Sequence, residues 1–315
     1  MYKKWMTSGL VAAMLLVPTA GVASAEELKE DIFVHGADLN QSQLNETKSK
    51  LNVKDNTKTY NVTTSDVAKY TGNQNLAYIH SSVTIHPKSF RKGISVEITT
   101  PENITKVTKA QYTNAAITAG IQNADIKIAS VDQVTGEGAL SGIYKAYEAE
   151  GHTLDMNDIQ NSQSELNQLS NISQQNQGQN GYSDEALNHA VADMKREIAQ
   201  EVQKNQNVSN TTITNIVNTH LENNGLINIL SDNQINQIIN IMNNVANSKA
   251  ITEDPKAFEQ QAKDLTEQIK KSSGDLLEKA KSLDSQENRN LLQQIWDAIV
   301  NFFNSIWNFI TSFFK

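Results

Sequence analysis

The chain has 315 residues, no cysteine and a formal net charge of −8 at pH 7. Nucleic acid is not an expected partner of so acidic a chain, because the phosphate backbone attracts basic surfaces. The lack of cysteine excludes a disulfide framework, so folding depends on burial of an apolar core or on partners. The length is enough for about two domains.

The first 25 residues have the features of a secretory signal peptide. Lys3 and Lys4 form a charged start, Gly9 to Val17 an apolar stretch, and Ala23 to Ala25 a small-residue cleavage site. Cleavage after Ala25 removes two lysines and no acid, which leaves a net charge of −10. The apolar stretch is shorter than the about 20 residues that span a bilayer. We therefore expect a secreted, extracellular protein, with cell-envelope association as a further expectation.

Residues 26–153 alternate β-branched runs with helical patterns, which predicts an α/β domain with a small mixed sheet. Strand patterns cover residues 57–63, 76–86, 93–99 and 125–130, and helical patterns cover residues 41–51, 103–119 and 136–150. The stretch from residue 93 to residue 150 thus forms a βαβα unit. Its two strands are expected to lie parallel, joined by the intervening helix.

Residues 154–182 are dominated by Asn, Gln and Ser. So few apolar side chains are typical of a solvated linker, and we predict one here. Residues 183–290 carry narrow apolar stripes of helical period, and Ser231 with Gln234 has the spacing of a capping box. The predicted fold class is therefore α+β, an α/β domain followed by an all-helical C-terminal region.

Three phrases in the first region carry a family resemblance: TPENIT at residues 100–105, YTNAAITAG at 112–120 and VTGEGALSGIYKA at 134–146. With the signal peptide, the early GADLNQSQLNETKSKL and the aromatic C-terminus, they make the chain resemble a secreted bacterial protein family of unknown function that includes Bacillus YpuA. The resemblance implies an exported protein of Gram-positive bacteria, connected with the cell envelope. It implies no catalytic residues, because the family has no established activity.

The stretch VTGEGALSG follows a predicted strand and opens a predicted helix, where backbone N–H groups can hold a phosphate. The candidate anion-binding residues are Thr135, Gly136 and Gly138. The spacing fits neither a dinucleotide fingerprint nor a P-loop, since Ser141 stands where a third glycine would be and no lysine follows. We favour the alternative, a structural turn whose glycines allow close packing of helix on sheet.

No metal-binding or catalytic residues are predicted. His80 and His86 share a face of one predicted strand, but about 20 Å at about 3.3 Å per residue separates them, too far for one metal. The sequence has no HExxH, CxxC or GxSxG spacing. Glu148 and Glu150 lie beside Lys145 and fit a solvated helix face. We expect no metal and no cofactor, and we lean towards a protein that is not an enzyme.

Residues 291–315 form an aromatic segment at the end of a polar chain. Its candidate membrane or docking residues are Trp296, Phe302, Phe303, Trp307, Phe309, Phe313 and Phe314. As an amphipathic helix it has one narrow stripe of polar residues and a broad apolar face. Such a helix, about 36 Å long, could cross a bilayer, but the Asn residues in the stripe disfavour a lone span. Three destinations remain: the chain's own surface, a membrane interface and a second copy.

These patterns favour an exported, non-catalytic, cell-envelope-associated protein with a binding or interaction role. The expected partners are a membrane surface, the cell wall or a second copy, reached through the C-terminal helix. Two alternatives stay open. One is an envelope-modifying enzyme with a site near Thr135 to Gly138, and the other is a membrane-active, pore-forming helical protein.

Overall fold

The computed structural model describes residues 28–72, 74, 76–89, 93–205 and 207–282. The strands are β1 (Ile32–Gly36), β2 (Lys58–Val62), β3 (Ser82–Pro87), β4 (Ser95–Ile98) and β5 (Ala124–Ala129). The helices are α1 (Gln41–Lys50), α2 (Thr64–Thr71), α3 (Lys109–Thr118), α4 (Glu137–Ala149), α5 (Met156–Asn176), α6 (Asp184–Asn205), α7 (Asn210–Asn223), α8 (Asp232–Ala246), α9 (Lys249–Glu253) and α10 (Pro255–Ser282). The predicted signal peptide and the aromatic segment lie outside the described residues.

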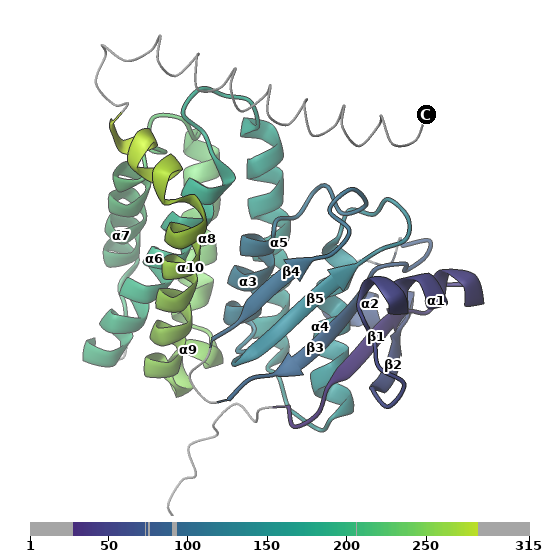
Figure 1. The fold of residues 1–315 in the computed structure, drawn as a ribbon. Helices are drawn as coiled ribbons and strands as arrows, with labels where there is room; N and C mark the ends of the chain where they lie inside the picture. Colours follow the sequence, from purple (N-terminus) through teal and green to yellow (C-terminus); the bar gives the residue numbers. More distant parts are fainter. Residues whose placement is uncertain (1–27, 73, 75, 90–92, 206, 283–315) are drawn as a thin grey trace, which may run out of the picture.

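The five strands form one mixed sheet in the order β2-β1-β3-β5-β4. β1 is parallel to β2 and β4 is parallel to β5, whereas β3 runs antiparallel to both of its neighbours. Helix α3 connects β4 to β5 and α4 follows β5, so the predicted βαβα unit with parallel strands is confirmed. The α+β fold class is confirmed as well, with the sheet on one side of the molecule and the helical half on the other (Figure 1).

The two faces of the sheet differ in what covers them. Alternate residues of the central strands, such as Val34 and Ile126, belong to the main core with α3 and α4. On the other face, Phe33 and Ala129 form a small separate cluster with Leu51 at the end of α1. Strand β1 was not predicted from the sequence. Its residues Ile32, Phe33 and Val34 are all buried, and a strand buried on both faces shows no alternation of apolar and polar residues.

The segment predicted to be a linker is a helix. Within α5, Leu166, Leu169 and Ile172 are almost completely buried, and the helix packs against α2, α3 and α8. The prediction of a solvated linker is therefore wrong for residues 156–176. Several of its polar side chains are buried with hydrogen-bond partners; Ser162, for example, donates to the carbonyl of Ala115 at 2.5 Å.

Other helix and strand boundaries in the structure differ by several residues from those predicted from the sequence. Helix α3 begins at Lys109 with a capping box on Thr108, whereas the sequence indicated a start near residue 103. Helix α2 was missed, and β3 begins at Ser82 rather than near residue 76. The capping box of Ser231 and Gln234 at the start of α8 is confirmed.

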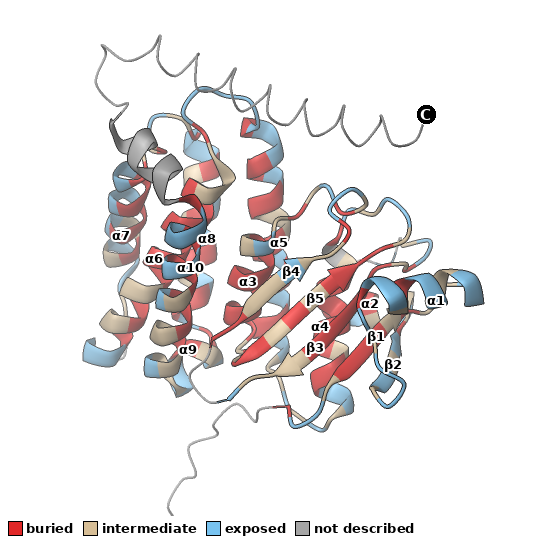
Figure 2. Cartoon of the chain, viewed as in Figure 1, coloured by how far each residue is buried: buried red, intermediate tan, exposed pale blue. Residues whose placement is uncertain are grey.

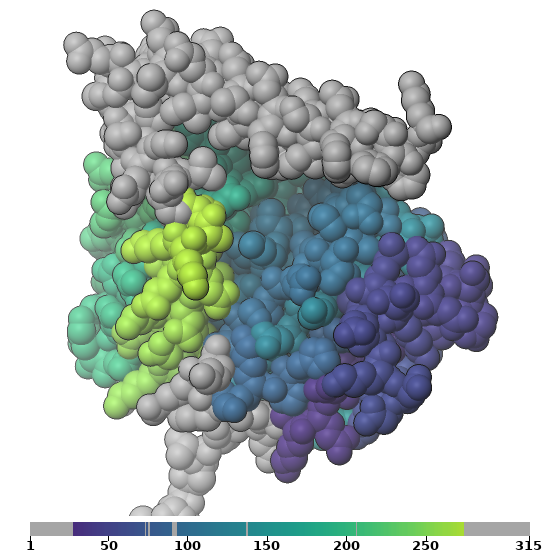
Figure 3. Space-filling view, in the orientation of Figure 1, coloured from purple at the N-terminus to yellow at the C-terminus, as the bar shows by residue number. Residues whose placement is uncertain are grey.

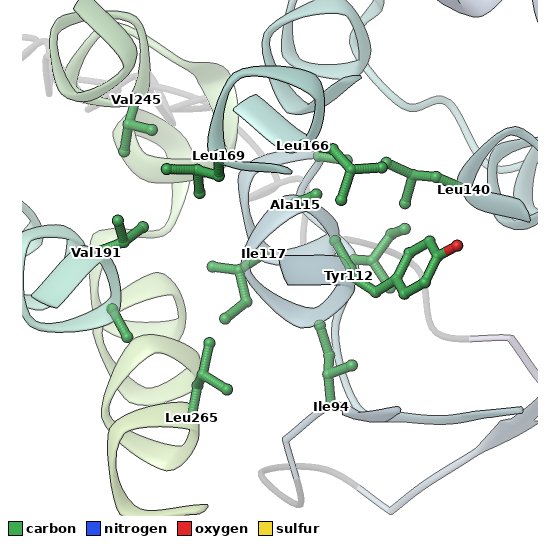
Figure 4. Close-up of a cluster of buried hydrophobic side chains, with 14 of the residues drawn as sticks. Ile94, Tyr112, Ala115, Ile117, Leu140, Leu166, Leu169, Val191, Val245 and Leu265 are labelled. Carbon is green, nitrogen blue, oxygen red and sulfur yellow. The ribbon is translucent and has the colours of Figure 1, made fainter. Parts of the chain in front are cut away.

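A single apolar core extends from the sheet into the helical half. In Figure 4, Tyr112 and Leu140 lie on one side of α3, and Val191 and Leu265 lie on the other. Central strands and inward helix faces are buried throughout this region (Figure 2). Helix α10 lies directly against the β4 side of the sheet (Figure 3), where Gln268 donates from Nε2 to the Ile94 carbonyl at 3.0 Å.

A fully buried ion pair joins three helices inside this core. The Lys195 ammonium on α6 lies 2.6 Å from Glu165 Oε1 on α5, and both side chains are 0% exposed. Two residues of α3 complete the network, because Thr118 donates to Glu165 Oε2 and Lys195 donates to the carbonyl of Asn114. Burial lowers the pKa of Lys195, and the Glu165 carboxylate opposes that shift.

We predict that Glu165→Gln costs about 3–5 kcal/mol of unfolding free energy, because it leaves a buried ammonium without its counter-charge. Glu165→Gln combined with Lys195→Met should lose less than the single Glu165 variant, since no charge is then buried. Urea unfolding of the wild type, both single variants and the double variant measures these terms. A double variant that loses the sum of both single losses would contradict this account of the pair.

Candidate binding groove

The loop between α4 and α5 lies at the centre of two adjoining hollows. They measure about 730 and 420 Å³, and both are lined by residues 151–154 and Met156. The volume of the larger one is in the range of about 300–1,000 Å³ that is typical of small-molecule sites. We name the two hollows together the loop groove.

The larger hollow forms where two helices end and another begins. Beyond α3 and α4, Gly120 and Gly151 adopt the left-handed conformation, with φ of 80° and 83°. Asp155 then caps α5 by accepting from the backbone N–H groups of Asn157 and Asp158 at 2.9 and 3.2 Å. Two helix ends and one helix start therefore border the larger hollow.

The far wall is α9, which α5 holds in place through two carboxylates. Asp158 accepts hydrogen bonds from the backbone N–H groups of Lys249 and Ala250, at 3.2 and 2.8 Å. The Lys249 ammonium lies 2.9 Å from Asp155 Oδ2. Segments more than 90 positions apart in the sequence are thereby joined across one hollow.

The two carboxylates differ in their acid–base behaviour. Burial raises the pKa of Asp158 to about 6, although the two backbone N–H groups favour its ionised form. The hydrogen bond from Lys249 holds the pKa of Asp155 below its usual value, with two backbone N–H groups acting in the same direction. The hollow therefore combines one carboxylate that resists protonation with one that is protonated in mild acid.

The smaller hollow is bounded by an ion pair on its other side. Glu148 accepts hydrogen bonds from the Lys69 ammonium and the Tyr70 hydroxyl, which together hold the pKa of Glu148 below its usual value. Lys145, expected beside Glu148 and Glu150, instead lies 2.8 Å from Asp66.

Glu150 is paired in the same way as Glu148. It accepts from the Tyr60 hydroxyl and lies 2.8 Å from the Lys58 ammonium. The expected solvated face of α4 is therefore joined to β2 and α2 by ion pairs and tyrosine hydrogen bonds.

The predicted anion-binding residues lie at the other end of β5 from the larger hollow. Gln122, just before β5, lines the hollow, whereas Thr135 follows the strand and is exposed. Gly136 caps α4 with φ of 98°, and a Cβ atom there would lie 2.6 Å from the Tyr112 hydroxyl. A Cβ on Gly138 would lie 3.2 Å from Ser81 Oγ. The glycines thus permit close packing, and anion binding by this loop stays a prediction.

The two histidines considered for metal binding each pair with a carboxylate. His80 Nδ1 lies 2.7 Å from Asp132, and His86 Nδ1 lies 2.9 Å from Asp31. Within the described part of the chain, no three His, Asp or Glu side chains are grouped as metal ligands. None of the described helices combines the length and apolarity of a membrane span.

The loop groove was not predicted from the sequence, although some of the residues that form it have a recognisable pattern. Gly120, Gly151 and Asp155 are recognisable as helix-stop and helix-start residues. The hydrogen bonds from α9 to Asp158 are not recognisable, because they join distant segments. Because residues 154–182 were predicted to be a solvated linker, α5 was also not expected to form part of a site.

Comparison with known proteins places the chain in a family without an assigned activity. The family model described as "Protein of unknown function (DUF1002)" matches residues 35–265. The chain belongs to the DUF1002 family. The matched residues run from β1 into α10 and contain the whole loop groove.

One curated relative extends the similarity to nearly the whole chain. It is the "Uncharacterized protein YpuA" of Bacillus subtilis (strain 168), 28% identical over 328 residues that cover 99% of this chain and 100% of the relative. The resemblance noted from the sequence phrases is therefore confirmed. No solved structure matches the chain.

The packing role of Gly136 can be tested against Gly225, which also has a left-handed backbone, with φ of 70°, but has nothing within 4 Å of an added Cβ. Both alanine variants should lose about 1–2 kcal/mol of unfolding free energy, because alanine disfavours the left-handed backbone. Gly136→Ala should lose about 1–3 kcal/mol more, because its methyl group meets Tyr112 and Ile104. Urea unfolding measures both losses, and equal losses would refute the packing role.

Proposed function

We propose that this protein is an exported, non-catalytic component of the cell envelope with a binding role, and that the loop groove is its binding site. The observation that carries the proposal is the hollow of about 730 Å³, to which three separate segments contribute. Ligand sites are typically such concave regions, with apolar surface and a few convergent polar groups. Leu154, Met156 and Ala250 supply apolar surface, and Asp155 and Lys249 supply charge.

Export is supported by the sequence of residues 1–25, with its charged start, apolar stretch and small-residue cleavage site. The absence of cysteine agrees with export by an organism that does not rely on disulfides. The acidic mature chain would not adhere to anionic lipid by charge alone. Attachment to the envelope therefore requires another contact.

The aromatic segment, residues 291–315, is our candidate for that contact. Burial of a Phe or Trp side chain contributes roughly 1.5–3 kcal/mol. Burial of its seven aromatic side chains would therefore contribute on the order of 10 kcal/mol to the free energy of docking. We propose that the segment is a docking or membrane-interface element, with its polar stripe facing water.

Liposome flotation tests this part of the proposal. The mature protein, residues 26–315, should float with phosphatidylglycerol/phosphatidylethanolamine vesicles, and a form ending at Asn290 should remain at the bottom of the gradient. A full-length form with Trp296→Asn and Trp307→Asn is the matched control and should float poorly. Equal thermal unfolding of all three would show that the described fold is retained. Equal flotation of the long and short forms, or no flotation by either, would remove membrane attachment.

A further inference from the structure

We infer that the larger hollow of the loop groove takes an organic cation with an apolar body, such as a protonated amine or a guanidinium on a hydrocarbon frame. This inference rests on the proposed binding role of the groove and names the class of its ligand. It is carried by the charges and the apolar residues that line one concave surface.

The carboxylates of the larger hollow outnumber its ammonium groups. Four carboxylates line it, those of Asp155, Asp158, Glu253 and Asp254, against the single ammonium of Lys249. Asp158 stays mainly ionised at neutral pH, since burial raises its pKa only to about 6. A cation entering the hollow is attracted by this excess, and an anion is repelled.

Most of these carboxylates are engaged inside the protein. Asp155 pairs with Lys249, Asp158 holds the start of α9, and Asp254 Oδ1 accepts from the N–H of Ala257 at 3.0 Å. Glu253 is exposed, and it has no hydrogen bond or ion pair with another described residue. Glu253, whose charge acts on Lys249 without a direct ion pair, is therefore the carboxylate most available to a ligand.

The same hollow offers apolar surface that a simple inorganic cation would not use. Met156 is 38% exposed, and only it and Tyr78 are strongly exposed large hydrophobic side chains in the described part of the chain. Leu154, Ala119 and Ala250 line the hollow beside it. A flexible thioether adapts to ligands of different shape, so Met156 suits the apolar body of the cation.

The chain's own aromatic segment is a poorer occupant. Residues 291–315 contain one lysine, Lys315 at the very end, and one acid, Asp297. That segment therefore offers almost no positive charge to the carboxylates. An external cationic ligand fits the lining better.

Methionine methyl NMR can test this inference on the mature protein. Cleavage after Ala25 leaves three methionines, of which Met156 lines the hollow and Met194 and Met242 are 0% exposed and serve as internal references. The three probes are octylammonium, octyl sulfate and octyl glucoside, which share a chain and differ in head-group charge. Octylammonium should shift the Met156 methyl signal saturably and leave both reference signals in place. Octyl sulfate should bind at least tenfold more weakly, and octyl glucoside should be intermediate.

A matched pair of variants tests the role of Glu253. Glu253→Gln should weaken octylammonium binding about two- to fivefold, the effect expected for one exposed charge pair. Glu222→Gln removes an exposed carboxylate from α7, away from the groove, and should leave binding unchanged. Equal weakening by both variants would show a general charge effect and overturn the assignment to this hollow.

Three further results would overturn the inference. They are equal binding of the cationic and anionic probes, no Met156 shift with any probe, and a shifted Met156 signal on removal of residues 291–315 without any probe. The last result would make the aromatic segment the occupant. Failure of vesicle flotation would leave the NMR outcome unaffected, because flotation concerns residues 291–315 and the titration concerns the hollow.

Discussion

The buried ion pair of Lys195 and Glu165 is the contact on which the arrangement of the helices depends. Its partners lie on α6 and α5, and α3 completes it through Thr118 and the Asn114 carbonyl. The βαβα unit, the Asn- and Gln-rich segment and the helical half each contribute to this one network. An unpaired charge in a dry core is costly, so arrangements of the three helices that leave this network open are destabilised.

The same helix connects the ion pair to the loop groove. Asp158 precedes Glu165 by seven residues, about two helical turns, so the two carboxylates lie on one face of α5. Glu165 lies in the core. Asp158, two turns earlier, holds α9 by accepting from the N–H groups of Lys249 and Ala250. The walls of the hollow are thereby set by the core packing, and a hollow with fixed walls can select a ligand by charge and shape.

Local patterns predicted the elements whose burial follows a regular period. The alternation of Val96 and Ile98 with polar neighbours indicated β4, and the residue pair Ser231 and Gln234 indicated the start of α8. The prediction of a solvated linker failed at α5, where polar residues are buried with hydrogen-bond partners. Composition alone does not distinguish such residues from solvated ones. The glycine turn at Gly136 was recognised from the sequence as the start of a helix, and anion binding there stays a prediction. The loop groove depends on contacts between distant segments, which leave no local pattern.

The central claim is that the polar segment α5 is an integral part of one folded core that joins the sheet to the helices. Hydrogen exchange of the mature protein, followed by mass spectrometry, tests it most directly. The account predicts that peptides from α5 are protected to the same degree as peptides from β5 and α6, because all of them open only on global unfolding. Rapid exchange of residues 157–176 beside a protected β5 would contradict it and would restore the flexible linker.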